Sequence, residues 1–285
     1  MSNALARLRE TFNDPLFVRT AQGMVPTPMA QNIIGPVRNA LSLLRVSVQE
    51  SRIFNPQQAA KTYRISMTDL TEAVILPLLF QRLRRLAPTV VIESFLSKRR
   101  ETTKELAAGR LDFAVDAPLN TDPQVRHVKL MEDRYVCAMR KGHPMAGKDK
   151  FTLDDYLSLT HIHISSRRNG LGHVDLALGK MGIQRKIALR SQHYLIASQV
   201  LQHTDMVMTV PERFARRHEL HWFNLPVNDV PPVETHLYWH ESTDQDPANR
   251  WMREQMIELC QQVTAHEKKL DGKQACPASG GEAAP

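Results

Sequence analysis

The sequence predicts a mixed α/β protein in which two α/β lobes follow a smaller amino-terminal segment of different character. From about residue 60 onward, short apolar runs typical of strands alternate with amphipathic stretches typical of helices, the pattern of βαβ units on a parallel sheet. Before residue 60 the pattern instead indicates a helix, a hairpin and one long helix. The length of 285 residues suits two domains, or one large domain with appendages.

The amino-terminal segment begins with an expected helix over residues 2–12, whose leucines and phenylalanine fall on one face. Asn13-Asp14-Pro15 ends this helix. Two extended pieces, 16–20 and 24–27, lie on either side of a short turn and predict a small hairpin, or wing.

A long helix is expected from Thr27-Pro28 to about Ser51, with a kink at Pro36. Its apolar residues lie alternately three and four positions apart, as in a heptad repeat: Ile34, Val37, Leu41, Leu44 and Val48. Because this repeat is too short for a long coiled coil, it predicts a contact with another helix, in the same chain or in a second copy. We therefore interpret residues 29–58 as a linker and dimerisation helix.

The same alternation of strands and helices builds both lobes. In the first lobe, strands are expected at 63–67, 90–95 and 111–115 and helices at 70–86 and 100–108, the second helix stopped by Gly109. In the second lobe, strands are expected at 161–165, 186–190 and 206–210 and helices at 174–181, 194–203 and 212–218, the first helix stopped by Gly182.

Two further strands, 134–140 and 233–240, flank the second lobe, which fits two crossings between the lobes with a cleft between them. The last strong helix is expected at 248–263. These elements predict a first lobe of residues 59–133 and 237–265, a second lobe of residues 134–236, and a disordered polar tail of residues 266–285.

Composition excludes several classes of protein. A mean hydropathy of −0.36 and a longest apolar run of residues 73–80 argue against a membrane-spanning chain. Three scattered cysteines, Cys137, Cys260 and Cys276, argue against a disulfide framework or a cysteine zinc site, and no secretory signal opens the chain, so a cytoplasmic setting is expected. The net charge of +7 is compatible with nucleic-acid binding without proving it.

Motifs for catalysis or for a resident cofactor are not found in the sequence. His161 and His163 share a strand face, as do His236 and His240, but two ligands do not make a zinc site. Gly170-Leu171-Gly172 is half of a dinucleotide-binding motif and lacks its third glycine. Nucleophile elbows, phosphate-binding loops and zinc-protease motifs are also missing. We therefore expect no metal, no cofactor and no enzymatic activity.

Three turns at the expected carboxyl ends of strands carry polar side chains, where ligands of open α/β sheets bind. The first contains Thr68 and Asp69, the second Ser165, Asn169 and His173, and the third His193. Backbone N–H groups at helix starts, hydroxyls and imidazoles together favour a small anion such as a carboxylate. Because the charge of Asp69 opposes an anion, we expect Asp69 to cap its own helix.

Many short runs of this sequence resemble the LysR-type transcriptional regulators, in the branch of nodulation regulators and regulators of aromatic catabolism. The runs are residues 2–10, 14–19, 26–28, 67–69, 135–137, 140–144, 172–175, 203–205, 209–211, 238–240 and 246–251. The resemblance implies a winged helix-turn-helix, a linker helix and a two-lobed effector-binding domain of the periplasmic-binding-protein type. It also implies DNA and a small-molecule inducer as partners, and a homodimer or homotetramer.

The resemblance places DNA-binding residues on the recognition helix and around the wing: Ser2, Asn3, Arg7, Arg19, Thr20 and Thr27. Family members carry two helices and a turn before the segment that matches Ser2, so residues 1–28 are expected to be a partial winged helix-turn-helix. A lone recognition helix has little core to hold it. Two functions therefore stay open: a ligand-responsive, DNA-binding transcriptional regulator, and a small-molecule binding module without DNA binding.

The resemblance also bears on the effector. The aromatic-responding branch is similar at His173 and His193 and uses that part of the second lobe for its inducer, which implies a small anionic or aromatic effector here. Gln245 stands where aromatic-responding relatives tend to carry a basic residue, a departure that bears on whether the inducer is an aromatic acid.

Overall fold

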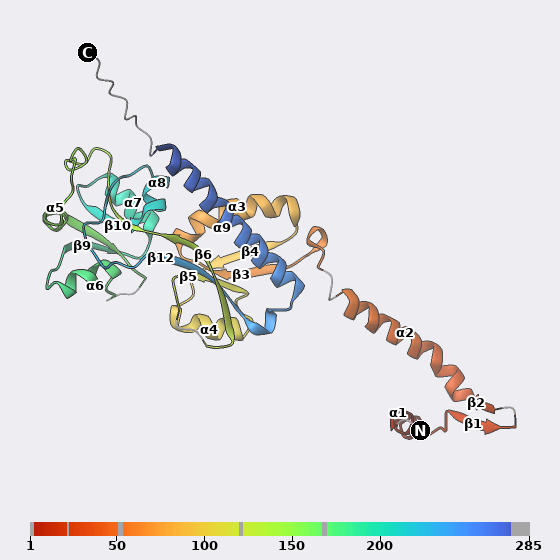
Figure 1. Ribbon diagram of the computed structural model, residues 1–285. Coiled ribbons are helices and arrows are strands. Elements are labelled where there is room, and N and C mark those ends of the chain that lie inside the picture. Colours follow the sequence, from red (N-terminus) through yellow and green to blue (C-terminus); the bar gives the residue numbers. More distant parts are fainter. Residues whose placement is uncertain (1–2, 22, 51–53, 120–121, 167–169, 275–285) are drawn as a thin grey trace, which may run out of the picture. The chain divides into compact units, whose positions relative to one another are not determined.

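The computed structural model describes residues 3–21, 23–50, 54–119, 122–166 and 170–274. The chain divides into an amino-terminal unit, Met1–Phe54, and a carboxyl-terminal unit, Asn55–Pro285 (Figure 1). None of the helices in these described ranges combines the length and the apolar character needed to cross a bilayer.

The amino-terminal unit is a helix, a hairpin and a long helix, as the sequence predicts. Its elements are α1 (Asn3–Phe12), β1 (Phe17–Thr20), β2 (Gly23–Pro26) and α2 (Pro28–Glu50). The strands pair antiparallel, with Val18 opposite Val25. Asn13, in the left-handed region at φ 46°, ends α1. We expected a kink at Pro36 because a proline has no N–H to donate within the helix. Helix α2 continues as one helix through this residue.

Lobe I of the carboxyl-terminal unit contains a five-stranded sheet in the order β4-β3-β5-β12-β6. Its strands are β3 (Thr62–Ser66), β4 (Val91–Phe95), β5 (Phe113–Asp116), β6 (Val125–Asp133) and β12 (Val233–His240). Its helices are η1 (Pro56–Gln58), α3 (Asp69–Leu86), α4 (Arg99–Ala107), η2 (Glu241–Thr243) and α9 (Pro247–Gln274). Strands β3, β4 and β5 are parallel, whereas β12 runs antiparallel to both of its neighbours.

Helices cover both faces of this sheet because successive side chains of a strand point to opposite faces. Phe113 and Val115 of β5 pack in one core with α3 and α9, and Ala114 between them packs in another core with Leu106 of α4. Gly109, at φ 66°, ends α4 where the sequence predicts a stop.

Lobe II contains a second, separate five-stranded sheet in the order β11-β7-β10-β8-β9. Its strands are β7 (Tyr135–Met139), β8 (Thr160–Ile164), β9 (Lys186–Ser191), β10 (Val207–Pro211) and β11 (His221–Asn224). Its helices are α5 (Leu153–Ser158), α6 (His173–Lys180), α7 (Tyr194–Gln202) and α8 (Glu212–Arg217). One core joins the sheet to α7 and α8, and a second core on the other face joins it to α5 and α6.

One of the two chain crossings between the lobes lies at Arg134, the single residue between β6 and β7. The carbonyl of Arg134 accepts a hydrogen bond from the backbone N–H of Glu212, and its guanidinium pairs with the Glu212 carboxylate. The carboxylate of Asp133 accepts a bond from the N–H of Arg213 at 3.0 Å. The start of α8 is therefore bound to the crossing point.

The structure corrects several expectations about the lobes. Both sheets are mixed rather than parallel, because the crossing strands β7 and β12 run antiparallel to their neighbours. Residue 233 already pairs with Asp133 of lobe I, so the return to lobe I comes before Val233 and not between residues 236 and 237. Helix α9 continues past its expected end at Val263 to Gln274, so the first part of the expected tail is helical, while residues 275–285 lie outside the described residues.

Two of the strands and one of the α-helices were not predicted at all. Strand β6 mixes charged and apolar residues without a clean alternation, α5 has 6 residues, and β11 has 4. Elements this short or this polar carry a weak periodic signal, because their place in the fold comes from pairing and packing with distant segments.

Candidate functional site

The residues expected to contact DNA lie in the amino-terminal unit. Asn3 and Arg7 are exposed on α1, and Arg19 and Thr20 are exposed on β1, where the Thr20 hydroxyl donates to the carbonyl of Gly23. Ser2 lies outside the described residues. The exposed polar side chains on the helix and the hairpin are suited to phosphate and base contacts.

Thr27, which we expected to contact DNA, has a structural role instead. Its side chain is buried, and its hydroxyl donates to Asp14 at 2.7 Å and accepts from the N–H of Ala30 at 3.1 Å. Thr27 is therefore the N-cap of α2 and joins it to the end of α1. Among the residues described in this unit, Leu16 and Ala30 are the buried apolar ones.

The first turn of the expected effector site lies at the start of α3. Thr68 is the N-cap, since its hydroxyl accepts from the N–H of Thr71 and its own N–H donates to the Thr71 hydroxyl. Our expectation that Asp69 caps its own helix is wrong. The Asp69 carboxylate instead accepts a hydrogen bond from the N–H of Leu195 in lobe II, at 3.2 Å.

The third turn faces the first one across the lobes, at the start of α7. His193 is the N-cap residue of α7 but makes no capping bond with its side chain, and its imidazole is exposed. The Ser191 hydroxyl accepts from the N–H of His193 and so shapes the turn. One of the first backbone N–H groups of α7, that of Leu195, thus donates to a carboxylate from the other lobe.

The second turn lies at the start of α6. His173 is the first residue of this helix and its side chain is exposed, while Ser165 lies directly after β8 and its N–H donates to the carbonyl of Ser191. Asn169 lies outside the described residues. The second and third turns are therefore neighbours at the carboxyl ends of the adjacent strands β8 and β9.

Sequence reasoning missed two tyrosines that lie among these turns. The ring of Tyr135, the first residue of β7, lies 6.2 Å from the ring of His173 between centroids. Burial raises the pKa of Tyr194, and the nearby Tyr135 and Asp69 raise it further, so these three side chains lie close together. Neither phenol makes a hydrogen bond within the described residues. A signal was present for Tyr194, which directly follows His193.

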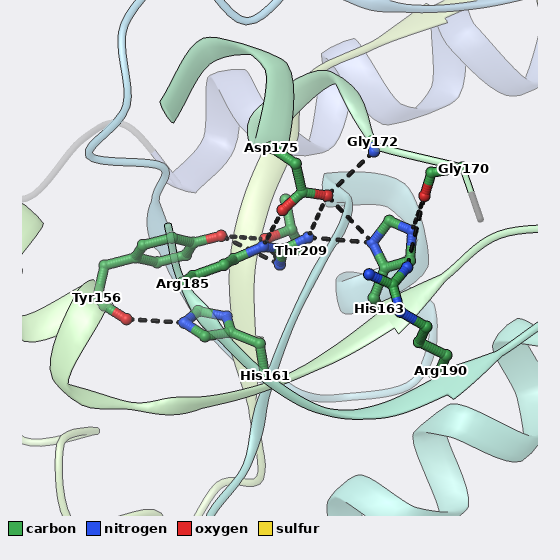
Figure 2. A network of polar contacts seen from close by, with 9 residues as sticks. All are labelled: Tyr156, His161, His163, Gly170, Gly172, Asp175, Arg185, Arg190 and Thr209. Atoms are coloured by element: carbon green, nitrogen blue, oxygen red, sulfur yellow. Dashed lines mark hydrogen bonds and ion pairs between the residues drawn. The ribbon is translucent and has the colours of Figure 1, made fainter. Parts of the chain in front are cut away.

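A buried polar network supports the second turn (Figure 2). The guanidinium of Arg185 binds both oxygens of Asp175, at 2.7 Å and 3.1 Å, and lies 3.2 Å from Nδ1 of His163. His163 in turn contacts the carbonyl of Gly170 through Nε2 at 3.1 Å. Asp175 accepts from the N–H of Gly172 at 3.0 Å.

Burial sets the protonation of this network. Burial lowers the pKa of His163, with the charge of Arg185 acting in the same direction and that of Asp175 opposing it. Burial alone would raise the pKa of Asp175, but the hydrogen bonds and charge of Arg185, together with the N–H of Gly172 and the nearby His163, outweigh it and hold the pKa below its usual range. The pKa of His161, which contacts the carbonyl of Tyr156, is lowered to about 4 by burial. Near neutral pH these groups give an ion pair beside two uncharged imidazoles.

A cavity between the lobes is small, at about 30 Å³. Leu70, Thr71 and Val74 of α3 line it from lobe I, and Arg213 and Phe214 line it from lobe II. Ligand pockets usually exceed ~300 Å³, so the lobes of this structure are closed on each other here. A larger and more open hollow of about 440 Å³, lined in part by Arg126, His127 and Trp239, lies within lobe I and contains none of the expected effector residues.

The histidine pairs that we considered as metal ligands are engaged otherwise. His236 pairs with Glu234, and its Nδ1 lies 3.2 Å from Nδ1 of His127. Nδ1 of His240 lies 2.8 Å from the Ser242 hydroxyl. Over the part of the chain that the structure describes, no three His, Cys, Asp or Glu side chains are grouped to hold a metal ion.

Comparison with known families decides the identity of the chain. The family model described as the LysR substrate-binding domain matches residues 56–261, which is all of both lobes except the end of α9. The chain belongs to the LysR family of transcriptional regulators. Residues 56–261 of this LysR regulator are its effector-binding domain.

Relatives extend the likeness to the amino-terminal unit. The chain is 35% identical to the HTH-type transcriptional activator NahR of Pseudomonas putida over 263 residues, which are 91% of this chain and 87% of that protein. It is 34% identical to the HTH-type transcriptional regulator SyrM 1 of Sinorhizobium fredii, over 94% of this chain and 78% of the relative. A solved structure of a probable transcriptional regulator from Pseudomonas aeruginosa matches with a TM-score of 0.65 and 31% identity, covering 89% of this chain and 86% of that one.

Proposed function

We propose that this LysR regulator senses a small anionic or aromatic effector where the starts of α3, α6 and α7 meet between the lobes. One observation carries the proposal: the carboxylate of Asp69 from lobe I already binds the N–H of Leu195 at the start of α7. A carboxylate thus fits this position, and helix starts favour negative charge. The rings of Tyr135, Tyr194 and His173 supply apolar faces for an aromatic ligand.

Thermal-shift and calorimetric titrations with benzoate, salicylate and the uncharged benzamide test this proposal. We expect the two acids to stabilise the chain and benzamide to have little effect. His173→Ala and His193→Ala should each weaken the response, by about tenfold in affinity for a lost charge-assisted bond. His203→Ala is a matched control, because His203 is exposed at the opposite end of α7. Equal responses in all three variants would remove this site assignment.

The amino-terminal unit is the proposed DNA-binding part, through Asn3, Arg7, Arg19 and Thr20. Their exposure on α1 and the hairpin supports this proposal. Arg7→Ala and Arg19→Ala should weaken binding to a promoter fragment and reduce the salt dependence of affinity, because each removes a cation near phosphate. Arg38→Ala, exposed on α2, is the control. Retained effector response with salt-independent or undetectable DNA binding would instead favour the alternative, a ligand-binding module.

A second copy of the chain is the proposed partner of α2. The seam residues whose side chains are described, namely Ile34, Val37, Leu41 and Leu44, are all exposed. Apolar residues at heptad spacing are stabilised when a second helix covers them. We therefore propose a homodimer through α2, with further association to a tetramer.

A further inference from the structure

The guanidinium of Arg185 uses all of its hydrogen-bond donors inside lobe II. Its Nε–H and one Nη2–H bind Asp175, and the second Nη2–H points at Nδ1 of His163. The two Nη1–H groups meet the hydroxyls of Tyr156 and Thr209 at 3.3 Å and 3.4 Å (Figure 2). An arginine has five N–H donors and no acceptor, so each of the five partner atoms, which belong to four residues, must offer a lone pair.

This requirement fixes the tautomer of His163. Since Nδ1 accepts from Arg185, it carries no proton, and the neutral ring must carry its proton on Nε2. That N–H then donates to the carbonyl of Gly170, 3.1 Å away. The low exposed fraction of His163, 3%, and the burial that lowers its pKa agree with an uncharged ring.

We propose that His163 and Arg185 are positioning residues of the effector site, because together they hold the turn that presents His173. Two hydrogen bonds hold the turn. His163 bonds to the carbonyl of Gly170, and Asp175 accepts from the N–H of Gly172. Arg185 in turn donates hydrogen bonds to both His163 and Asp175. This inference rests on the proposed function, in which His173 contacts the effector.

The turn lies very close to His163 and Asp175, which supports their role in holding it. A Cβ at Gly172 would lie 3.2 Å from Oδ2 of Asp175 and 3.2 Å from Cε1 of His163, which is tighter than ordinary contact. A glycine at this position therefore lets the backbone come within hydrogen-bond reach of Asp175. The turn and the network fit each other closely.

Protonation of His163 would weaken the hydrogen bonds that hold the turn. A proton on Nδ1 removes the acceptor for Arg185 and places an N–H beside Oδ2 of Asp175, at 3.3 Å. The titratable and charged groups around His163 are Asp175 of α6, Arg185 before β9, Arg190 of β9, His161 of β8 and Tyr156 of α5. Acidification that protonates His163 should therefore lower effector affinity, and the fall should be steeper in the wild type than in a variant without this imidazole.

Nitrogen-15 NMR of the histidine side chains tests the assignment without any effector. We expect His163 as a single Nε2–H tautomer from pH 6.5 to pH 8. An Nδ1–H tautomer, or rapid exchange between tautomers, would overturn the proposal.

Two substitutions then separate positioning from general stability. His163→Leu removes both polar contacts, whereas His163→Gln keeps a donor for Gly170 and an acceptor for Arg185. In the leucine variant, amide hydrogen exchange at Gly172 should accelerate by about tenfold and the affinity for benzoate should fall by about tenfold, with recovery in the glutamine variant. His161→Leu is the matched control, because His161 is equally buried on the same strand but contacts the carbonyl of Tyr156 instead of the turn.

The outcomes distinguish this inference from the function on which it rests. Unchanged exchange at Gly172 in His163→Leu would overturn the positioning role, whether or not benzoate binds. Faster exchange together with unchanged benzoate affinity would show that the turn does not serve the effector site, and would also overturn it. If the wild type binds neither benzoate nor salicylate, the proposed effector site fails, while the tautomer and the exchange at Gly172 still decide whether His163 holds the turn.

Discussion

The carboxylate of Asp69 accepts a hydrogen bond from the backbone N–H of Leu195, with 3.2 Å between Oδ2 and N. This bond joins the start of α3 in lobe I to the start of α7 in lobe II. A helix start carries unpaired N–H groups and a partial positive charge, so it binds negative groups. The chain thus places one of its own carboxylates where we propose that an anionic effector binds.

Asp69→Asn should raise the affinity for benzoate several-fold, because the substitution removes a like charge from the proposed site. The same change should lower the free energy of unfolding by about 0.3–1 kcal/mol, since α7 loses a favourable charge at its start. Isothermal calorimetry and urea denaturation measure the two effects.

Glu101→Gln is the matched control for Asp69, because Glu101 lies in the first turn of α4 and pairs with Lys98 on the surface of lobe I. It should leave benzoate affinity unchanged. Weaker benzoate binding in Asp69→Asn would show that Asp69 supports the effector rather than competing with it.

The stability of lobe II should fall in acid because of His161. The pKa of His161 is lowered by burial to about 4 in the folded chain, whereas an unfolded histidine titrates near its ordinary value of about 6.5. The unfolded chain therefore binds more protons between these values, and stability is lost as the pH falls through this window. Between pH 7 and pH 5 the loss from this residue is roughly 2 kcal/mol.

Urea denaturation of the wild type and of His161→Gln at pH 7 and pH 5 measures this contribution. The variant should lose correspondingly less stability on acidification. Burial also lowers the pKa values of His163, His218 and His221. These three histidines contribute to the pH dependence of stability in both proteins, so they do not account for the difference between them. An identical pH dependence in the two proteins would contradict the assignment to His161.

The seam of α2 should control association. Leu41→Glu places a charge in the proposed helix–helix contact and should raise the dimer dissociation constant by at least about tenfold, as expected for a charge in an apolar contact. Asn39→Glu, on the same helix but off the seam, should leave association unchanged. Sedimentation equilibrium of both variants compares them, and equal dissociation constants would mean that α2 is not the contact.

An ion pair on α9 should help to hold the lobes together. Nε of Arg213, in α8 of lobe II, lies 2.8 Å from both carboxylate oxygens of Glu267 on α9. Glu267→Gln should lower the free energy of unfolding by about 0.5–1 kcal/mol, because the pair is partly exposed. It should also accelerate amide exchange at Arg213, whose N–H binds Asp133.

Glu258→Gln is the corresponding control on the same helix, because Glu258 pairs with Arg82 inside lobe I. Its effect on stability should be similar, and exchange at the Arg213 amide should not change. Equal acceleration in both variants would show that α9 does not act between the lobes through Glu267.

The buried thiols should be unreactive in the folded protein. Burial raises the pKa of the Cys137 thiol, and it raises the pKa of Cys260 to about 12, so thiolate is scarce at both positions. In a Cys276→Ser background, we expect no labelling by Ellman's reagent at pH 8 and labelling of both thiols after unfolding. Labelling of either thiol in the folded chain would contradict this burial.

Local patterns predicted the elements that depend on local physics. Gly109 and Gly182 end their helices at positive φ, and the hairpin over 17–26 forms where short apolar runs flank a turn. Most helices and strands of the lobes lie within a few residues of their expected bounds. The short strand β11 escaped prediction because its four residues pair with β7, a partner far away in the sequence.

The expected site was only partly foreseeable for the same reason. Thr68, Asp69, His173 and His193 do stand at helix starts, as the pattern of strands and turns predicts. The partner of Asp69 could not be read from the sequence, because Leu195 lies in the other lobe. The burial of Thr27 depends likewise on Asp14, which reaches it only when the hairpin folds back.

The order of residues alone was enough to determine the alternation of strands and helices, the heptad seam of α2 and the polar turns at strand ends, since each depends on neighbours a few positions apart. The partner of Asp69, the tautomer of His163 and the path of α9 along both lobes were decided only by the tertiary structure. A hydrogen bond forms only between groups a few ångströms apart in space. Folding brings together groups that are more than a hundred residues apart in the sequence, as it does for Asp69 and Leu195.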